Sequence, residues 1–150
     1  MTPNEARAAI ILRILSVGSI PDDQIDFDNG ETFNIPSTDV NIWARVSIRF
    51  NARNRVSLGG RAVNRKYTRV GIATIQVFTP VTNGEYLNDL TCAEYEAALT
   101  DLADDRPLYY GGVPSGGDIR IDTVGRDGAW YQQNVVIPFF VDQQICGSPV

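Results

Sequence analysis

The chain has 150 residues, of which 43% are apolar and 21% are charged, with 18 acidic residues, 13 basic residues and no histidine. A chain of this length is expected to fold as one domain, residues 1–150, and to bury a core without a metal or a disulfide. The absence of histidine excludes Ser-His-Asp and Cys-His catalysis and imidazole metal sites, so only cysteine, carboxylate or lysine chemistry remains.

The two cysteines, Cys92 and Cys146, lie far apart and lack the CxxC spacing of zinc and redox sites. We expect both to be reduced thiols, because small scaffolds that depend on disulfides are shorter and richer in cysteine. No apolar run approaches the roughly 20 residues that a membrane-spanning helix needs, and the first residues lack the basic start of a signal peptide. The sequence therefore predicts a soluble protein, made in a cytoplasm, with no membrane partner.

A helix is expected at the start of the chain. Thr2 suits the N-cap, Pro3 the first helical position and Glu5 the third, where its carboxylate can bond back to the cap. Apolar residues recur on one side of the following segment, and Gly18 can take the left-handed closing conformation. The acidic stretch Asp22–Glu31 comes next and contains a tight-turn signal, Asn-Gly at 29–30.

That turn signal separates two short apolar pieces, Ile25–Phe27 and Phe33–Ile35, and predicts a loop or a small hairpin. Strict alternation of apolar residues over Val40–Phe50 predicts a strand. Asn51–Tyr67 is polar and rich in arginine, as expected of an extended loop or a long hairpin arm. A second strand is expected over Arg69–Thr79, where β-branched and aromatic residues dominate.

The second half of the chain adds a helix over Glu85–Leu102, whose apolar residues recur at helical spacing. The glycine-rich segment Gly111–Gly117 predicts no regular element. Two strands, Ile119–Val124 and Trp130–Val141, are expected after it, and Pro138 predicts an edge position or a bulge for the second. The fold class is therefore α+β: a mostly antiparallel β-sheet packed with two helices, with a long basic hairpin arm or loop.

Charge is distributed unevenly along the chain. No acidic residue occurs from Val40 to Gly84, and eight of the 13 basic residues lie within residues 45–69, which we call the basic band. The other residues carry five bases against 18 acids, a net charge of −13. A solvated strand face explains Arg45 and Arg49 but not the absence of compensating acids, because soluble surfaces usually mix both signs. We therefore interpret the band as a surface for a partner. The candidate interface residues are Trp43, Arg45, Arg49, Arg53, Arg55, Arg61, Arg65, Lys66, Tyr67 and Arg69.

Motifs for chemistry are incomplete. The segment from Asp26 to Ser37 resembles a calcium loop, but its glycine falls at position five instead of six and Ser37 replaces the bidentate glutamate. The glycine-rich segments lack the ending of a phosphate-binding loop. Lys66 lies in an exposed basic region, where burial cannot lower its pKa for catalysis. Three pairs of acids are typical of solvated charge: Asp22/Asp23, Glu94/Glu96 and Asp104/Asp105. We predict no enzymatic activity, no cofactor, no metal and no small-molecule substrate.

Nucleic-acid binding is an alternative from a different class. The basic band is interleaved with Trp43 and Tyr67, and single strands are held by aromatic stacking together with phosphate pairing. Contacts from all eight bases would give a log-log salt slope of roughly −7. Trp43 suits a subunit interface equally well, because Trp and Arg are enriched at interface hot spots.

The ordered set of segments resembles the tail terminators of long-tailed bacteriophages, the group similar to the minor tail protein U of lambdoid phages. The resemblance rests on the capped N-terminal helix, the strand NIWARVSI at 41–48 and VSLGG at 56–60. It continues with RVGIATIQVFTP at 69–80, the Asn-Gly that follows, and WYQQNVVIPF at 130–139. The segments cover most of the chain in order, whereas Gly111–Gly117 does not align with the family pattern.

The resemblance implies an α+β subunit of a hexameric ring that caps the head-proximal end of the tail tube. Such a ring stops tube polymerisation and offers a surface for neck and head joining. It implies a structural virion protein without cofactors, assembled in the host cytoplasm. The implied partners are copies of the chain itself, the tail tube protein and a neck or head-completion protein, with genomic DNA passing through the lumen. Another ring protein of the head-tail neck is the runner-up.

Overall fold

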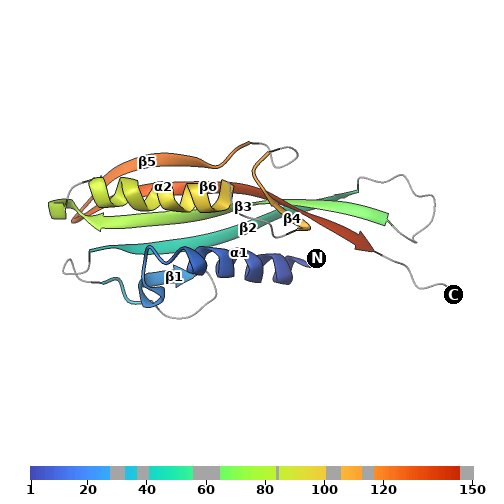
Figure 1. Ribbon diagram of the computed structural model, residues 1–150, viewed down its shortest axis with the longest axis horizontal. Helices are drawn as coiled ribbons and strands as arrows, with labels where there is room; N and C mark the ends of the chain where they lie inside the picture. The colour runs from blue at the N-terminus through green and yellow to red at the C-terminus, as the bar shows by residue number, and fades with distance from the viewer. Residues whose placement is uncertain are drawn as a thin grey trace.

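A six-stranded sheet forms the centre of the computed structural model (Figure 1), which describes residues 1–27, 33–36, 41–55, 65–83, 85–100, 106–112 and 117–145. The helices are α1 (Pro3–Val17) and α2 (Tyr86–Thr100), with short 3-10 turns at Asp22–Gln24 (η1) and Val81–Asn83 (η2). The strands are β1 (Ile25–Phe27), β2 (Trp43–Arg55), β3 (Arg65–Pro80), β4 (Leu108–Tyr110), β5 (Arg120–Asp127) and β6 (Trp130–Ile145). Their order is β1-β2-β3-β6-β4, and β5 also pairs with β6. All pairs are antiparallel except β1 with β2, so the predicted α+β class is confirmed.

Helix α1 begins and ends as the sequence predicts. The Glu5 amide donates to Thr2 Oγ1 at 3.3 Å, and the Thr2 amide donates to Glu5 Oε2 at 3.4 Å, which completes the capping box. Gly18 closes the helix with φ 73°, a left-handed conformation that glycine adopts without steric cost. The helix buries Ala6, Ile10 and Ile14, one turn apart, against the core.

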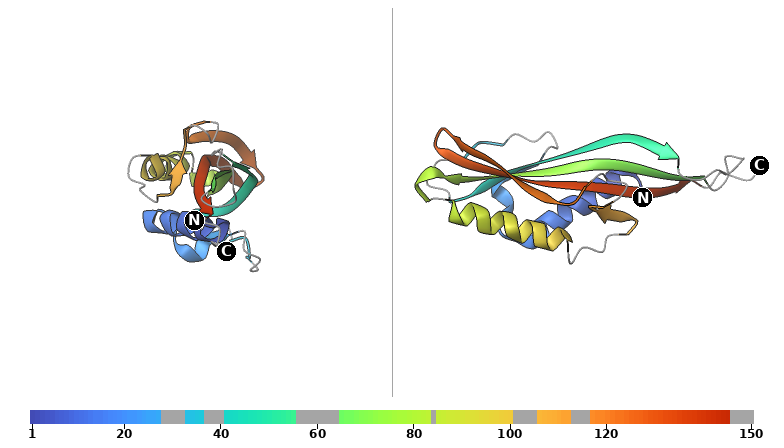
Figure 2. Two further views of the ribbon diagram at one scale, coloured as in Figure 1. Left: turned by 90° about the vertical axis from the view of Figure 1, so that its right-hand side faces the viewer. Right: turned by 90° about the horizontal axis from the view of Figure 1, so that it is seen from above.

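Both helices lie on the same side of the sheet (Figure 2), and we call that side the helix face and the opposite side the open face. Alternate residues of the three long strands are buried on the helix face, as the period of two in a strand requires. They pack against apolar side chains of α1 and α2. Members of this core include Ile10, Ile14, Ala44, Val46, Ile48, Ala73, Ile75, Val77, Tyr95, Leu99, Val135, Ile137 and Phe139.

A buried asparagine joins α2 to the sheet. Asn88 Nδ2 donates to Val77 O at 3.0 Å, to Tyr131 O at 3.1 Å and to Thr79 Oγ1 at 3.3 Å. Its Oδ1 accepts a hydrogen bond from Cys92 Sγ at 3.3 Å. Because a buried amide must be hydrogen-bonded, these contacts fix the position of α2 on β3 and β6.

Strand β6 is central, so the predicted edge position or bulge at Pro138 is wrong. One edge of β6 pairs with β3 along its whole length, and the other pairs with β5 up to Val136 and with β4 from Phe139. The Pro138 carbonyl accepts from the Gly111 amide at 2.7 Å, so its nitrogen also faces the side where β5 gives way to β4. Neither β4 nor β5 pairs with residue 138 on that edge of β6, so no strand hydrogen bond requires an N–H at this position.

Of the two alternatives predicted around residues 25–35, a loop or a small hairpin, the hairpin is not formed by the described residues. β1 pairs in parallel with β2, with Ile25 opposite Ala44, and residues 33–36 are not a strand. The turn signal at 29–30 and residues 37–40 lie outside the described residues. Ile25, opposite Ala44, is buried in the core.

The long hairpin arm is confirmed. β2 continues to Arg55 and β3 begins at Arg65, so both strands extend beyond the N-terminal start of α1 (Figure 1). We use "arm" for residues 51–55, 65–69 and 141–145, because the end of β6 pairs with β3 there. Within the arm Thr68 Oγ1 donates to Asp142 Oδ1 at 3.0 Å.

The remaining predictions are met in part. α2 covers most of the predicted 85–102 helix, and its last predicted residues fall outside the described part of the chain. β4 was not predicted, and within the glycine-rich 111–117 segment Gly112 pairs with Gly117 as an isolated bridge. Cys92 is a buried free thiol, as predicted, and Cys146 is not among the described residues. No helix in the described ranges is long and apolar enough to cross a membrane.

Candidate interaction surfaces

The ten candidate interface residues do not share one surface. Trp43, Arg45 and Arg49 lie on the open face of β2, because the residues between them, Ala44, Val46 and Ile48, are buried on the helix face. A β-bulge between Phe50 and Arg53 then inserts one extra residue into β2. A one-residue shift moves every later residue to the other side of a strand.

Beyond the bulge the register places basic residues on the helix-face side of the arm. Arg53 lies directly opposite Arg69, and Arg55 lies opposite Tyr67. Arg65, Tyr67 and Arg69 alternate along β3 in phase with the buried core residues Ala73 and Ile75. Of the other candidates, Lys66 lies opposite Gln144 on the alternate side of β3, and Arg61 is outside the described residues.

The register places two arginines, Arg53 and Arg69, at directly opposed positions of the arm. Two arginines at directly opposed positions destabilise a strand pair. Arg69 is half-buried, and its Nε is buried with no hydrogen-bond partner among the described residues. Asp142 is the acid that β6 brings to the arm, and it occupies the alternate side, opposite Thr68. The described arm therefore carries more basic than acidic residues.

Trp43 is buried, which the sequence analysis missed. Its indole stacks on Phe78 with ring centroids 4.2 Å apart and on Phe33 at 5.6 Å, and Trp130 approaches edge-on at 6.0 Å. These partners come from residues far apart in sequence, so local alternation could not reveal the cluster. Trp43 is consequently not available as an exposed stacking platform for nucleic acid.

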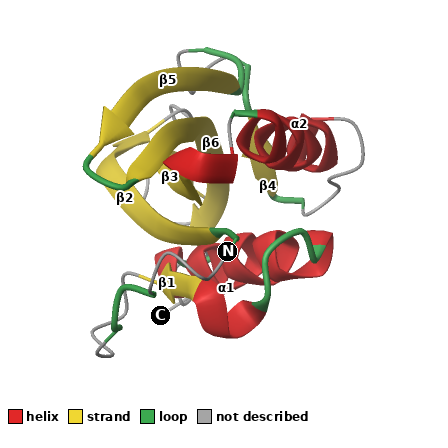
Figure 3. Cartoon of the chain, turned by 90° about the vertical axis from the view of Figure 1, so that its left-hand side faces the viewer, coloured by secondary structure: helices red, strands yellow, loops and turns green. Residues whose placement is uncertain are grey.

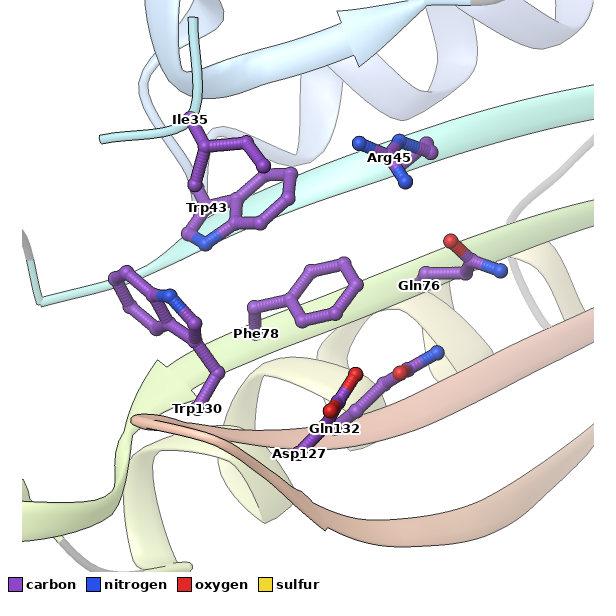
Figure 4. Close-up of a pocket in the computed structure, with 8 residues that line it drawn as sticks. All are labelled: Ile35, Trp43, Arg45, Gln76, Phe78, Asp127, Trp130 and Gln132. Atoms are coloured by element: carbon purple, nitrogen blue, oxygen red, sulfur yellow. The ribbon is translucent and has the colours of Figure 1, made fainter. Parts of the chain in front are cut away.

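A pocket of about 340 Å³ opens beside this aromatic cluster on the open face (Figure 4). Its lining residues are Ile35, Trp43, Arg45, Gln76, Phe78, Asp127, Trp130 and Gln132. Arg45 forms an ion pair with Asp26 at 3.0 Å and lies over the Trp43 ring at 5.5 Å. One candidate interface arginine is therefore engaged within its own chain.

Helix α2 carries the opposite charge to the arm. It contains Asp89, Glu94 and Glu96 and no basic residue. Ser19 Oγ donates to Glu94, and Gln133 Nε2 donates to Asp89, so two of the three carboxylates also contact neighbouring elements. Viewed along the strands (Figure 3), α2 lies outside the curled sheet. One subunit thus displays a basic arm and an acidic helix at different places.

The acids of α2 affect their buried neighbours. Burial raises the pKa of the Cys92 thiol to about 12, and the nearby carboxylates of Asp89 and Glu96 add to the shift. Burial also raises the pKa of the Tyr95 phenol, with a further contribution from Glu94. Both groups stay protonated at neutral pH, so this thiol is a poor nucleophile.

The described residues contain no group of three or more Cys, Asp or Glu that could hold a metal ion. The acid pairs considered in the sequence lie apart from the pocket: Asp22/Asp23 in η1 and Glu94/Glu96 on α2, with Asp104/Asp105 outside the described residues. Within the pocket, Asp127 is the acid and Arg45 the base.

Comparison with known proteins gives a fold relationship. No protein family model matches the chain, and no curated protein matches it. A solved structure that carries no functional description superposes with a TM-score of 0.63 at 17% sequence identity. The match covers 100% of this chain and 99% of the other. At this identity the likeness shows that the two proteins share a fold over their full lengths.

Proposed function

We propose that the protein is a structural, non-enzymatic virion subunit that forms a ring at the head-proximal end of a phage tail tube. The observation that carries this proposal is the separation of a basic arm from an acidic helix within one subunit. Complementary charges at different places on identical subunits favour a head-to-tail contact, in which the arm of one copy meets the acids of the next.

The arm supports this contact in two ways. Arg53 and Arg69 occupy directly opposed positions of the β2–β3 ladder, and like charges at such positions destabilise a strand pair. The buried Nε of Arg69 has no acceptor among the described residues, and a carboxylate from a neighbour would supply one. Arginine is suited to this role because its planar guanidinium binds carboxylates through two hydrogen bonds.

A head-to-tail contact closes into a ring when its rotation divides a full turn and otherwise forms a filament. The resemblance to tail terminators adds the biological setting. In that setting the ring, expected to be a hexamer, caps the tube, ends its polymerisation and presents a surface to the neck. Its partners are copies of itself, the tail tube protein and a neck or head-completion protein, and genomic DNA passes through its lumen.

The test of termination is the particle assembled by a phage that lacks this gene. Loss of a terminator leaves tubes longer than normal and without heads, visible by negative-stain electron microscopy. Full heads beside tails of normal length would contradict termination and favour a different ring of the head-tail neck.

The charge contact is tested by reversing Arg53, Arg55 and Arg61 to Glu together. We expect a folded subunit whose assembly, measured by native mass spectrometry, is weakened. Reversing Glu94 and Glu96 to Lys in the same chain should restore part of the assembly. Arg126→Glu, an exposed change on β5 outside the arm, is the control for one charge reversal elsewhere on the subunit. Unfolding of the triple variant would show that the arm is needed for the fold.

Nucleic-acid binding is the competing function from another class. The same protein should be mixed with random single-stranded oligonucleotides at low salt and then at increasing salt. Tight binding with a steep salt dependence would favour that function. Absence of binding at low salt would leave assembly as the role of the basic band.

A further inference from the structure

The pocket on the open face contains a buried donor without an acceptor. Trp43 is 2% exposed, and its Nε1 has no hydrogen-bond partner among the described residues. Trp130 approaches edge-on with ring centroids 6.0 Å apart, and an aromatic ring is a weak acceptor. Figure 4 shows the Trp43 nitrogen on the side of the indole that faces Trp130 and Phe78. Because buried donors are almost always paired, this donor indicates a ligand that brings an acceptor.

Of the other four polar side chains of the pocket, Arg45 and Gln132 are paired, Asp127 is exposed, and Gln76 is half-buried. Arg45 is bound to Asp26, and Gln132 Nε2 donates to Asn134 Oδ1 at 2.8 Å. Asp127 is exposed at the rim. The buried part of the pocket therefore offers a donor beside aromatic rings, and a matching ligand has a carbonyl at that depth without an N–H beside it.

We propose that this pocket binds an extended, proline-containing segment of another protein. The amide that precedes a proline has a carbonyl acceptor and no N–H, which matches the donor of Trp43. Proline-rich segments are extended before they bind, and they dock on grooves lined with aromatic rings. The near-parallel rings of Trp43 and Phe78, 11° apart, and the perpendicular ring of Trp130 form such walls.

Ile35 completes the pocket at its open side. It is 59% exposed although it is a large apolar residue, and it lines the cavity beside Trp43. A bound segment would cover it, and apolar side chains at such edges keep water away from central contacts. The site uses no residue of the arm, so this inference stands independently of ring assembly.

The chain has two tryptophans, and both line this pocket, so indole signals report on it alone. The probe is a blocked hexaproline peptide added to the ¹⁵N-labelled protein, and the control is a blocked peptide of equal length with alternating Gly and Ser. We expect the hexaproline to move the Trp43 indole N–H resonance downfield, as a new hydrogen bond requires, and the control peptide to leave it in place.

Two substitutions separate binding from folding. Trp43→Phe keeps an aromatic ring and removes the donor, so affinity for hexaproline should fall about tenfold while the melting temperature stays level or rises. Ile35→Ser removes the exposed wall and should also weaken binding. Val124→Ser is the matched control, since Val124 is 54% exposed on β5 and does not line the pocket.

Three results would overturn the proposal: no change in either indole resonance at saturating hexaproline, equal shifts with the Gly-Ser peptide, or unchanged affinity in Trp43→Phe. A shift produced by oligonucleotides but not by hexaproline would assign the pocket to nucleobases instead.

Discussion

The two halves of the β2–β3 hairpin share one antiparallel ladder but have different surroundings. In the body half, Ala44, Val46 and Ile48 are buried beneath the helices, and burial of apolar area holds the strands in register. In the arm half, beyond the bulge at Phe50, the same ladder pairs arginine with arginine. The comparison shows that strand pairing continues beyond Phe50, the last residue of β2 that is described as packed against the core.

The largest loss of stability is expected at Gly71, where the body half ends. A Cβ there would lie 2.4 Å from Phe139 Cζ and 2.6 Å from the Arg49 carbonyl oxygen, and the backbone atom cannot move aside easily. Gly71→Ala should lower the free energy of unfolding by about 3 kcal/mol, measured by urea denaturation. Gly117→Ala, which has open space and no positive φ, is the control. Equal stability of the two variants would show that the body half accommodates the added methyl group.

Asn88→Ala comes next in size. It leaves the buried carbonyls of Val77 and Tyr131 without this donor, and we expect a loss of about 2 kcal/mol in thermal or urea unfolding. Asn51→Ala, at an exposed position in the arm, should change stability by less than about 0.5 kcal/mol. A similar loss for both would contradict the contrast between body and arm.

Alkaline pH tests the burial of α2 on the body half. The pKa of Cys92 is raised by folding, so its contribution is complete below the ordinary value of 9.0 and is lost as pH rises toward about 12. The test compares two proteins, the Cys146→Ser variant and the same variant with Cys92→Ala added. Between roughly pH 9 and pH 10, the free energy of unfolding should fall by about 1 kcal/mol more in the protein that keeps Cys92. In the native chain Cys92 should also resist thiol reagents at pH 8 until the protein unfolds. If the free energy of unfolding depended on pH in the same way in both variants, the Cys92 thiol would be accessible to water.

The smallest effect is expected in the arm. Arg53→Glu replaces a like-charge pair with an opposite-charge pair across from Arg69, and the free energy of unfolding should rise by about 0.5 kcal/mol at low salt. The gain should shrink in high salt because exposed charges are screened. Arg126→Glu serves as the control for net charge. A large loss of stability in Arg53→Glu would contradict the expectation that the opposed arginines destabilise the arm.

Local patterns predicted much of the fold. The capping box at Thr2 and Glu5, the closing Gly18 and the alternation around Ala44 depend on neighbours in sequence, and each was confirmed. The position of Pro138 was predicted wrongly, because the break between β4 and β5 that tolerates it depends on strands brought together by the fold.

The candidate surface was harder to predict for the same reason. Counting charges located the basic band, but the bulge after Phe50 divides its residues between two faces, and no sequence signal marked it. The burial of Trp43 depends on Phe33, Phe78 and Trp130, which approach it only in the folded chain. A tryptophan on the face opposite the core could therefore not be distinguished from an exposed one.

The central position of β6 has a consequence for the order of folding. This strand follows all the others in the chain, yet β3, β4 and β5 all pair with it. During synthesis, β4 and β5 have no partner strand until residues 130–145 leave the ribosome, whereas the β2–β3 hairpin can close earlier. Folding of the sheet is therefore expected as one late, cooperative step governed by contacts distant in sequence, which are slow to form. A basic hairpin that closes before its own sheet is complete would be exposed to neighbouring chains throughout that interval.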